Sequence, residues 1–126
     1  MLPRVSATTE PLVRALNVVY LYVSDMERSL AFYRDLLGIP LRGDDDWQEA
    51  SLGGSRFALH RTHEGIGELS VGTIHLSFEV RDLAEATERL RASGIEAKEA
   101  ARGDWGAAAE VTDPDGYRIF LFEPPR

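Results

Sequence analysis

The stretch VYLYVSD, residues 19–25, alternates aliphatic with aromatic or polar side chains and runs into a helical pattern over residues 26–37 that stops at Gly38-Ile39. A second stretch, LSFEVRD, residues 76–82, alternates in the same way and runs into a helical pattern over residues 83–93 that stops at Gly94-Ile95. Asp82 follows Asp25 by 57 residues. Alternation predicts a strand, and apolar residues three or four apart predict a helix. The repeat therefore predicts two similar modules within one domain.

Short polar residues precede both predicted helices. Ser24, followed by Glu27 three residues later, matches a capping box, in which each side chain satisfies a free backbone N–H at the start of a helix. Asp82 and Glu85 repeat this pattern before the second helix. The two helices are therefore expected to begin at equivalent positions of the repeat.

Strand patterns follow each predicted helix. Residues Trp47–Leu52 and Ser55–His60 flank the hairpin signal Gly53-Gly54, whereas Ala107–Thr112 and Tyr117–Phe122 flank the turn Asp113–Gly116. Weaker strands are expected at Pro40–Gly43 and Glu96–Ala100. Each module thus has the order β-α-β-β-β, and the fold class is α+β. We expect an N-terminal arm over residues 1–12 and a single domain over 13–124, with module one at 13–65, module two at 71–124 and a linker at 64–71.

The composition excludes several classes of protein. The chain has 126 residues, 14 Lys and Arg against 21 Asp and Glu, a net charge of −7 and no cysteine. It can hold neither a disulfide nor a thiolate metal site. No apolar run is long enough for a membrane span, and the first residues lack the apolar region of a secretory signal, so we expect a cytoplasmic protein. The acidic balance argues against nucleic acid and suits a neutral or cationic partner.

The alternation assigns the strand residues to two faces of the predicted sheet. The face toward the helices carries apolar residues: Val19, Leu21, Val23, Phe57, Leu59, Ile74, Leu76, Phe78, Val80, Ile119 and Leu121. The opposite face mixes aromatic with polar residues: Val18, Tyr20, Tyr22, Arg56, His60, Thr73, His75, Ser77, Glu79, Arg118, Phe120 and Phe122. Ligand pockets pair apolar walls with a few polar groups in this way. A dimer interface or a half-exposed sheet face is the alternative interpretation.

Three segments give the chain a family resemblance. They are residues 21–25 with the helix residues 29–33 and Leu37-Gly38, residues 75–82 with their helix and Gly94, and residues 113–117 before the final strand. Together with the repeat, they resemble the vicinal oxygen chelate superfamily, also called the glyoxalase/bleomycin resistance/extradiol dioxygenase family. The resemblance covers about residues 13–124. It implies paired βαβββ modules that form a curved mixed sheet, a cup with the helices on its convex face.

In the metal-dependent members of this superfamily, four side chains on the concave face hold one divalent cation. Carried over by the resemblance, these positions are Val18, His60, His75 and Phe120. Valine and phenylalanine cannot ligate, and two histidines alone would hold a metal weakly, because a catalytic zinc normally takes three protein ligands. We therefore expect no metal cofactor; if a divalent metal is present, His60 and His75 are its expected ligands.

The resemblance is closest to the metal-free bleomycin-resistance-type members, which sequester a drug without chemistry. The Trp105-Gly106 pair before the last hairpin supports this comparison, and Trp47 is a second candidate wall. We expect a homodimer that binds an aromatic or cationic small molecule. The expected ligand-binding residues are Tyr20, Tyr22, Trp47, His60, His75, Trp105, Arg118, Phe120 and Phe122.

Two enzymatic alternatives stay open. One is a metal-dependent lyase, isomerase or dioxygenase that uses His60 and His75. The other is a metal-free enzyme with His75 as its acid or base. The candidate catalytic residues are His75 and Glu79.

Overall fold

The computed structural model describes residues 16–63 and 76–126. The predicted arm (1–12), the linker (64–71) and the predicted face residues Thr73, Ile74 and His75 lie outside these ranges. Within the described residues, no helix is long and apolar enough to cross a bilayer.

The first module forms a four-stranded mixed sheet with one helical segment. Its elements are β1 (Val18–Val23), α1 (Met26–Leu30), the π-helix η1 (Ala31–Leu36), β2 (Arg42–Gly43), β3 (Trp47–Leu52) and β4 (Ser55–Arg61). The strand order is β1-β4-β3-β2, with β1 parallel to β4 and the other pairs antiparallel. The β3–β4 hairpin turns at Gly53-Gly54 as predicted, and Gly53 has a φ of +62°.

The second module repeats this arrangement. Its elements are β5 (Leu76–Glu79), α3 (Leu83–Ala92), β6 (Ala97–Gly103), β7 (Gly106–Thr112) and β8 (Arg118–Glu123), in the sheet order β5-β8-β7-β6. Strand β5 is parallel to β8. The predicted order of elements and the paired modules are confirmed; the expected curved mixed sheet consists of two four-stranded mixed sheets. Tyr117 precedes β8 instead of opening it, because its backbone N–H is bonded to the Asp113 carboxylate in the turn.

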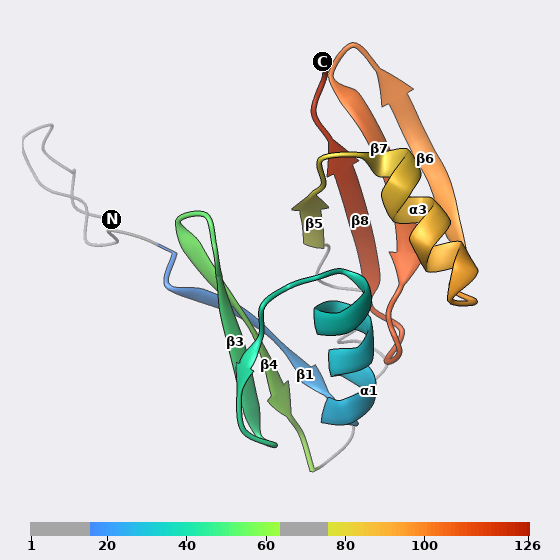
Figure 1. The fold of residues 1–126 in the computed structure, drawn as a ribbon. Helices are drawn as coiled ribbons and strands as arrows, with labels where there is room; N and C mark the ends of the chain where they lie inside the picture. The colour runs from blue at the N-terminus through green and yellow to red at the C-terminus, as the bar shows by residue number, and fades with distance from the viewer. Residues whose placement is uncertain (1–15, 64–75) are drawn as a thin grey trace, which may run out of the picture.

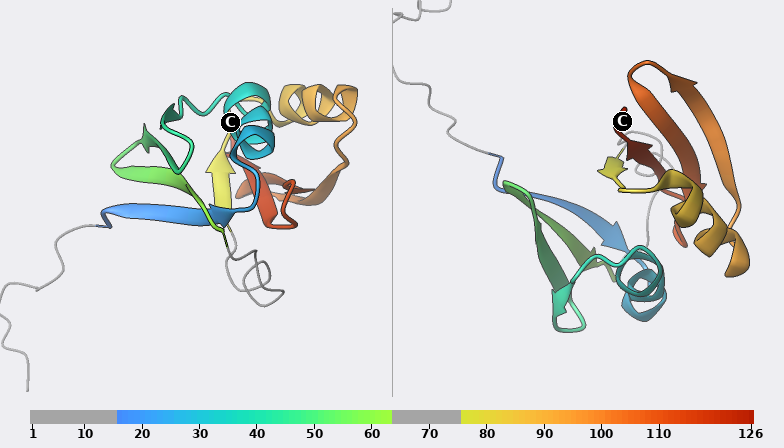
Figure 2. Two further views of the ribbon diagram at one scale, coloured as in Figure 1. Left: turned by 90° about the horizontal axis from the view of Figure 1, so that it is seen from below. Right: turned by 45° about the horizontal axis from the view of Figure 1, so that its top comes forward.

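The helices and the apolar strand residues share one side of the sheets. Figure 1 shows the two modules side by side, and Figure 2 shows α1 and α3 next to each other on the same side of the strands. Leu21, Leu59, Ile119 and Leu121 face this side and are at most 2% exposed. The rings of Phe57 and Phe78 meet edge to face at 5.2 Å, which joins the apolar layers of the two modules.

The start of the first helix differs from the prediction. The N-cap is Asp25, not Ser24: Asp25 has extended backbone angles and its side chain accepts a hydrogen bond from the Arg28 N–H. Ser24 is unavailable for capping because its hydroxyl donates to Asp115 of the second module. The second helix begins as predicted, with the Asp82 side chain accepting from the N–H of Glu85.

The first helical segment is also not a uniform α-helix. After Leu30 it widens into η1, in which the Leu37 N–H bonds to the carbonyl of Phe32, five residues back. The wider turn buries the neighbouring side chains Phe32 and Tyr33 together, at 2% and 0% exposure. The apolar spacing of residues 26–37 predicts a helix but does not distinguish a π-helical turn from an α-helical one, so the sequence period could not predict this feature.

Tyr33 reaches across to the second module. Its hydroxyl donates to Oδ2 of Asp113 at 2.6 Å, while Oδ1 of Asp113 accepts from the N–H groups of Asp115 and Tyr117 at 2.9 and 2.8 Å. Burial raises the pKa of Asp113 above its usual value, although these three donors oppose the shift. Burial, followed by the nearby Asp113 charge, raises the pKa of Tyr33 well above 10.0.

Candidate functional site

Four rings gather on the side of the first sheet that faces away from the helices. Tyr20 and Tyr22 come from β1, Trp47 from β3 and His60 from β4; the strand register places Tyr22 beside His60 and His60 beside Trp47. Alternation along β1 and β4 turns these side chains away from the core. We call Tyr20, Tyr22, Trp47 and His60 the aromatic surface.

The rings of the aromatic surface contact one another directly. The ring centroids of Tyr20 and Trp47 are 5.3 Å apart, those of Tyr22 and His60 are 5.3 Å apart, and those of Trp47 and His60 are 5.5 Å apart. Their planes are tilted by 31° to 66°, as in ordinary aromatic packing. The rings therefore form a continuous platform against which a flat ligand could pack.

The platform is open to solvent in the single chain. Tyr20 is 41% exposed and Tyr22 is 46% exposed. Nearby Tyr20, chiefly through hydrogen bonding to the Tyr22 side chain, raises the pKa of Tyr22, so the Tyr22 phenol keeps its proton at pH 7. Exposed clusters of large rings in soluble proteins commonly mark a ligand or partner surface.

His60 also has a buried polar atom without a partner: its Nδ1 has no hydrogen-bond partner among the described residues. An unsatisfied buried polar atom costs about 1–3 kcal/mol.

The second sheet carries fewer rings. Trp105, in the β6–β7 connection, stacks on Phe122 with centroids 6.1 Å apart and planes within 12°. Trp105 is 49% exposed. Gly103 makes room for it, because a Cβ at that position would lie 2.7 Å from Nε1 of the indole. The stack is therefore a second exposed aromatic feature, on the other module.

Ion pairs occupy equivalent positions on the two sheets. Arg56 of β4 pairs with Glu49 of β3, and Arg118 of β8 pairs with Glu110 of β7, each with an N–O distance of 2.9 Å. The pairs neutralise both arginines. The sequence prediction included Arg118 but not Glu49; alternation outward from Trp47 along the same strand is the signal that could have identified it.

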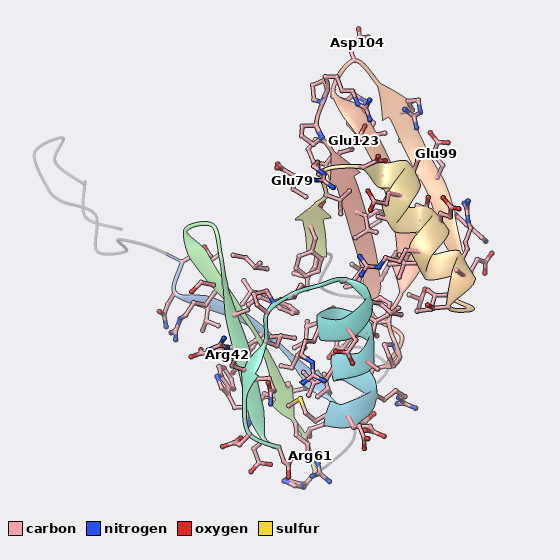
Figure 3. The ribbon with its side chains drawn as sticks, in the orientation of Figure 1. Arg42, Arg61, Glu79, Glu99, Asp104 and Glu123 are labelled. Carbon is pink, nitrogen blue, oxygen red and sulfur yellow. The ribbon has the colours of Figure 1, made fainter. Side chains whose placement is uncertain are left out.

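Glu79, a predicted catalytic candidate, is exposed on the edge strand β5 (Figure 3). It lines a cleft of about 540 Å³ between the modules, with Val19, Phe57, Leu76 and Phe78 as its apolar wall and Arg56 at its margin. None of the four residues of the aromatic surface lines this cleft. His75, the other catalytic candidate, lies outside the described residues.

The strand register bears on the positions that the resemblance assigns to metal ligands. Val19 pairs with Phe57 and its repeat equivalent Leu76 pairs with Ile119, so Ala58 is the equivalent of Phe120. His60 is the equivalent of Phe122, two residues further along the strand. The register therefore moves the implied position in the first module from His60 to Ala58.

The donor set does not fit a divalent cation. Val18, Ala58 and Phe120 have no ligating atom in their side chains, and the fourth position, His75, is outside the described ranges. Across residues 16–63 and 76–126, no group of three or more His, Asp or Glu side chains is placed to hold a metal ion. One remaining histidine falls short of the three protein ligands of a typical catalytic zinc site.

Comparison with known proteins gives a family match and several relatives. The family described as Glyoxalase/Bleomycin resistance protein/Dioxygenase superfamily matches residues 15–121. A lactoylglutathione lyase of Salmonella typhimurium is 33% identical over 118 residues, which cover 82% of this chain and 87% of that protein. A probable chloroplastic lactoylglutathione lyase of Arabidopsis thaliana is 32% identical over 125 residues, 87% of this chain. The chain spans only 35% of the length of that plant protein.

A solved structure extends the comparison to the fold. TnmS3, an antibiotic binding protein from Streptomyces sp. CB03234, superimposes with a TM-score of 0.72 at 23% identity, covering 91% of this chain and 99% of TnmS3. At this identity the likeness shows a shared fold and no shared ligand. The relatives thus include proteins named as enzymes and one named as a binding protein.

Proposed function

Because the chain belongs to the glyoxalase/bleomycin resistance protein/dioxygenase superfamily, we propose that it binds an aromatic small molecule without chemistry and without a metal. The observation that carries this proposal is the aromatic surface, in which four rings from three strands lie together and two of them are more than 40% exposed. Exposed rings of this kind offer stacking faces and phenol hydroxyls to a flat ligand.

One further observation supports a binding protein over an enzyme, and a second indicates the charge of its ligand. Of the four positions implied for metal ligands, after the strand register moves one of them from His60 to Ala58, three have side chains without a donor: Val18, Ala58 and Phe120. The fourth is His75. The net charge of −7 attracts a cationic ligand at long range, whereas the arginines near the site are already paired with Glu49 and Glu110. The proposed ligand is therefore aromatic, with a positive charge that aids its capture.

We further propose that the binding protein is a homodimer with composite cups. The aromatic surface is open on a single chain, so a second wall is needed to enclose a ligand. The stack of Trp105 on Phe122, contributed by the second module of a partner copy, is the proposed wall. Sedimentation velocity with and without ligand tests this part separately.

The binding test uses three probes that separate aromatic from cationic recognition. Proflavine is planar and cationic, 2-naphthol is planar and neutral, and spermidine is cationic with no ring. Isothermal titration of metal-stripped protein is expected to detect proflavine and 2-naphthol, with proflavine the tighter, and to detect no spermidine. Binding of spermidine alone, or of none of the three, contradicts the proposal.

The alternative function is a metal-dependent lyase, favoured by the 33% identity to the Salmonella lactoylglutathione lyase. Its test is the formation of a thioester product from the glutathione–methylglyoxal adduct after Zn²⁺, Ni²⁺ or Mg²⁺ is added to stripped protein. Metal-dependent turnover that is lost in a His75→Ala variant would support the lyase. Absence of turnover with all three metals supports the binding protein.

A further inference from the structure

The turn between β7 and β8 contacts the end of β1, in the other module. The Tyr117 hydroxyl donates to the backbone carbonyl of Tyr22 at 2.9 Å. Two residues along, Asp115 accepts from the N–H of Ser24 at 3.2 Å and from its hydroxyl, and lies 3.5 Å from the Arg28 guanidinium. Figure 1 shows this turn beside α1. The second module thus holds the chain at the point where the Tyr22 strand ends.

The β3–β4 turn of the first module makes no equivalent hydrogen bond to β5 among the described residues. This turn is Gly53-Gly54, and Ser55, the register equivalent of Tyr117, makes no side-chain hydrogen bond to β5 in the described part of the chain. The anchored strand and the unanchored strand also differ in what they carry. Strand β1 presents Tyr20 and Tyr22, whereas the equivalent positions of β5 are Ser77 and Glu79. The asymmetric contact therefore falls on the strand that builds the aromatic surface.

We infer that Tyr117 is a positioning residue for the aromatic surface. Its hydrogen bond fixes the Tyr22 carbonyl, and this fixes the backbone from which the Tyr22 ring packs against His60 at 5.3 Å. Tyr117 is only 3% exposed, so a ligand on the aromatic surface does not contact its ring. The expected effect of Tyr117 on ligand affinity rests on the proposed function. Its expected effect on the positions of the rings does not.

The hydroxyls of Tyr117 and Tyr33 both bond to groups at the β7–β8 junction, but they are expected to affect the aromatic surface differently. The hydroxyl of Tyr33 also bonds to this turn, at Asp113, but Tyr33 belongs to η1 on the helix side of the sheet. Loss of either hydroxyl destabilises the junction between modules. The Tyr117 hydroxyl bonds to the end of β1 itself, whereas the Tyr33 hydroxyl bonds to Asp113 within the turn. Tyr33→Phe is therefore the matched control.

The experiment compares Tyr117→Phe with Tyr33→Phe at a temperature where both are folded. In the Tyr117→Phe variant, proflavine is expected to bind about fivefold more weakly, because binding must re-order a strand end that has lost one neutral hydrogen bond. The Trp47 indole and His60 ring signals in NMR spectra of the free protein are expected to shift. In Tyr33→Phe, the affinity and these ring signals stay as in the parent.

Each outcome decides the inference. Unchanged ring signals in Tyr117→Phe overturn it, and so do equal shifts in both variants, which would indicate a general loosening of the junction. If the parent binds no probe, the proposed function fails, and the NMR comparison still tests the positioning role. Should Tyr117→Phe not fold, Asp115→Asn, which weakens the neighbouring contact to Ser24, takes its place with the same expected pattern.

Discussion

Tyr33→Phe removes one hydroxyl from the most buried polar junction between the two modules. Asp113 is 5% exposed and receives three hydrogen bonds, of which the one from Tyr33 is the shortest at 2.6 Å. Losing a hydrogen bond to a buried charged group costs about 1.5–3 kcal/mol. For a domain of this size, a loss of about 2 kcal/mol lowers the melting temperature by roughly 6–10 °C. Urea titration followed by circular dichroism measures the free energy of unfolding directly.

The pH dependence adds a second, independent signature. Burial already holds the pKa of Asp113 above its unfolded value, and the Tyr33 hydrogen bond lowers it; removing that bond raises the pKa further. A folded-state pKa above the unfolded value means that the ionised Asp113 carboxylate lowers the stability of the folded state. This loss of stability is full above the folded pKa and disappears as the pH falls through the folded pKa toward the unfolded value. The stability gap between variant and parent is therefore full at pH 7 and narrows in acid.

The control is Tyr20→Phe, which removes a hydroxyl from a side chain that is 41% exposed. A surface change of this kind is expected to alter the free energy of unfolding by about 0.5 kcal/mol or less. The reasoning is refuted if Tyr33→Phe costs no more than this control, or if its cost is the same at pH 7 and in acid.

Three further predictions concern the site and the repeat. Tyr22→Ala removes an exposed ring from the aromatic surface and is expected to weaken proflavine binding about tenfold by calorimetry while the melting temperature stays within a few degrees; an unchanged affinity would place the ligand elsewhere. Gly103→Ala puts a Cβ 2.7 Å from Nε1 of Trp105, so the indole must shift against Phe122, and the emission spectrum of Trp105 in a Trp47→Phe background is expected to change; an identical spectrum contradicts the stack. Asp82→Ala removes the N-cap of α3 and is expected to lower the free energy of unfolding by about 1 kcal/mol in urea, with Asp82→Asn close to the parent; an equal loss in both variants argues against the cap.

Local patterns predicted the elements of this fold well. The bounds of β3 match the prediction at both ends, and the start of β4 at Ser55 follows from the two glycines before it. The N-cap Asp82 was also predicted, because capping depends on residues only three apart. The weak strands were placed less well: β2 covers Arg42–Gly43 of the expected 40–43, and β6 extends to Gly103.

Features that depend on contacts between modules were not predicted. Ser24 matched a cap by spacing, but its hydroxyl bonds to Asp115, which lies 91 residues away. The π-helix over Ala31–Leu36 was not predicted, because the apolar spacing fits an α-helix as well. That Ala58 is the repeat equivalent of Phe120 follows only from the strand register, in which β1 pairs with β4 and β5 pairs with β8. Single-sequence periodicity reports which face a residue is on, not which residue is opposite.

For the site residues, too, the sequence predicted the face of the sheet but not which residues contact one another. Alternation placed Tyr20 and Tyr22 on one face, and the structure brings them together with Trp47 and His60. Trp105 lies on the other module with Phe122. The ligand-binding roles of all these residues stay predictions, as do the roles of Arg118, Phe120, His75 and Glu79.

Calorimetric titration of metal-stripped protein with proflavine, repeated after Zn²⁺ is added, is the most direct test of metal-independent aromatic binding. The prediction is saturable binding with the same Kd in both titrations and about tenfold weaker binding in Tyr22→Ala. Absence of binding to the stripped protein, or binding that appears only with Zn²⁺, would contradict it.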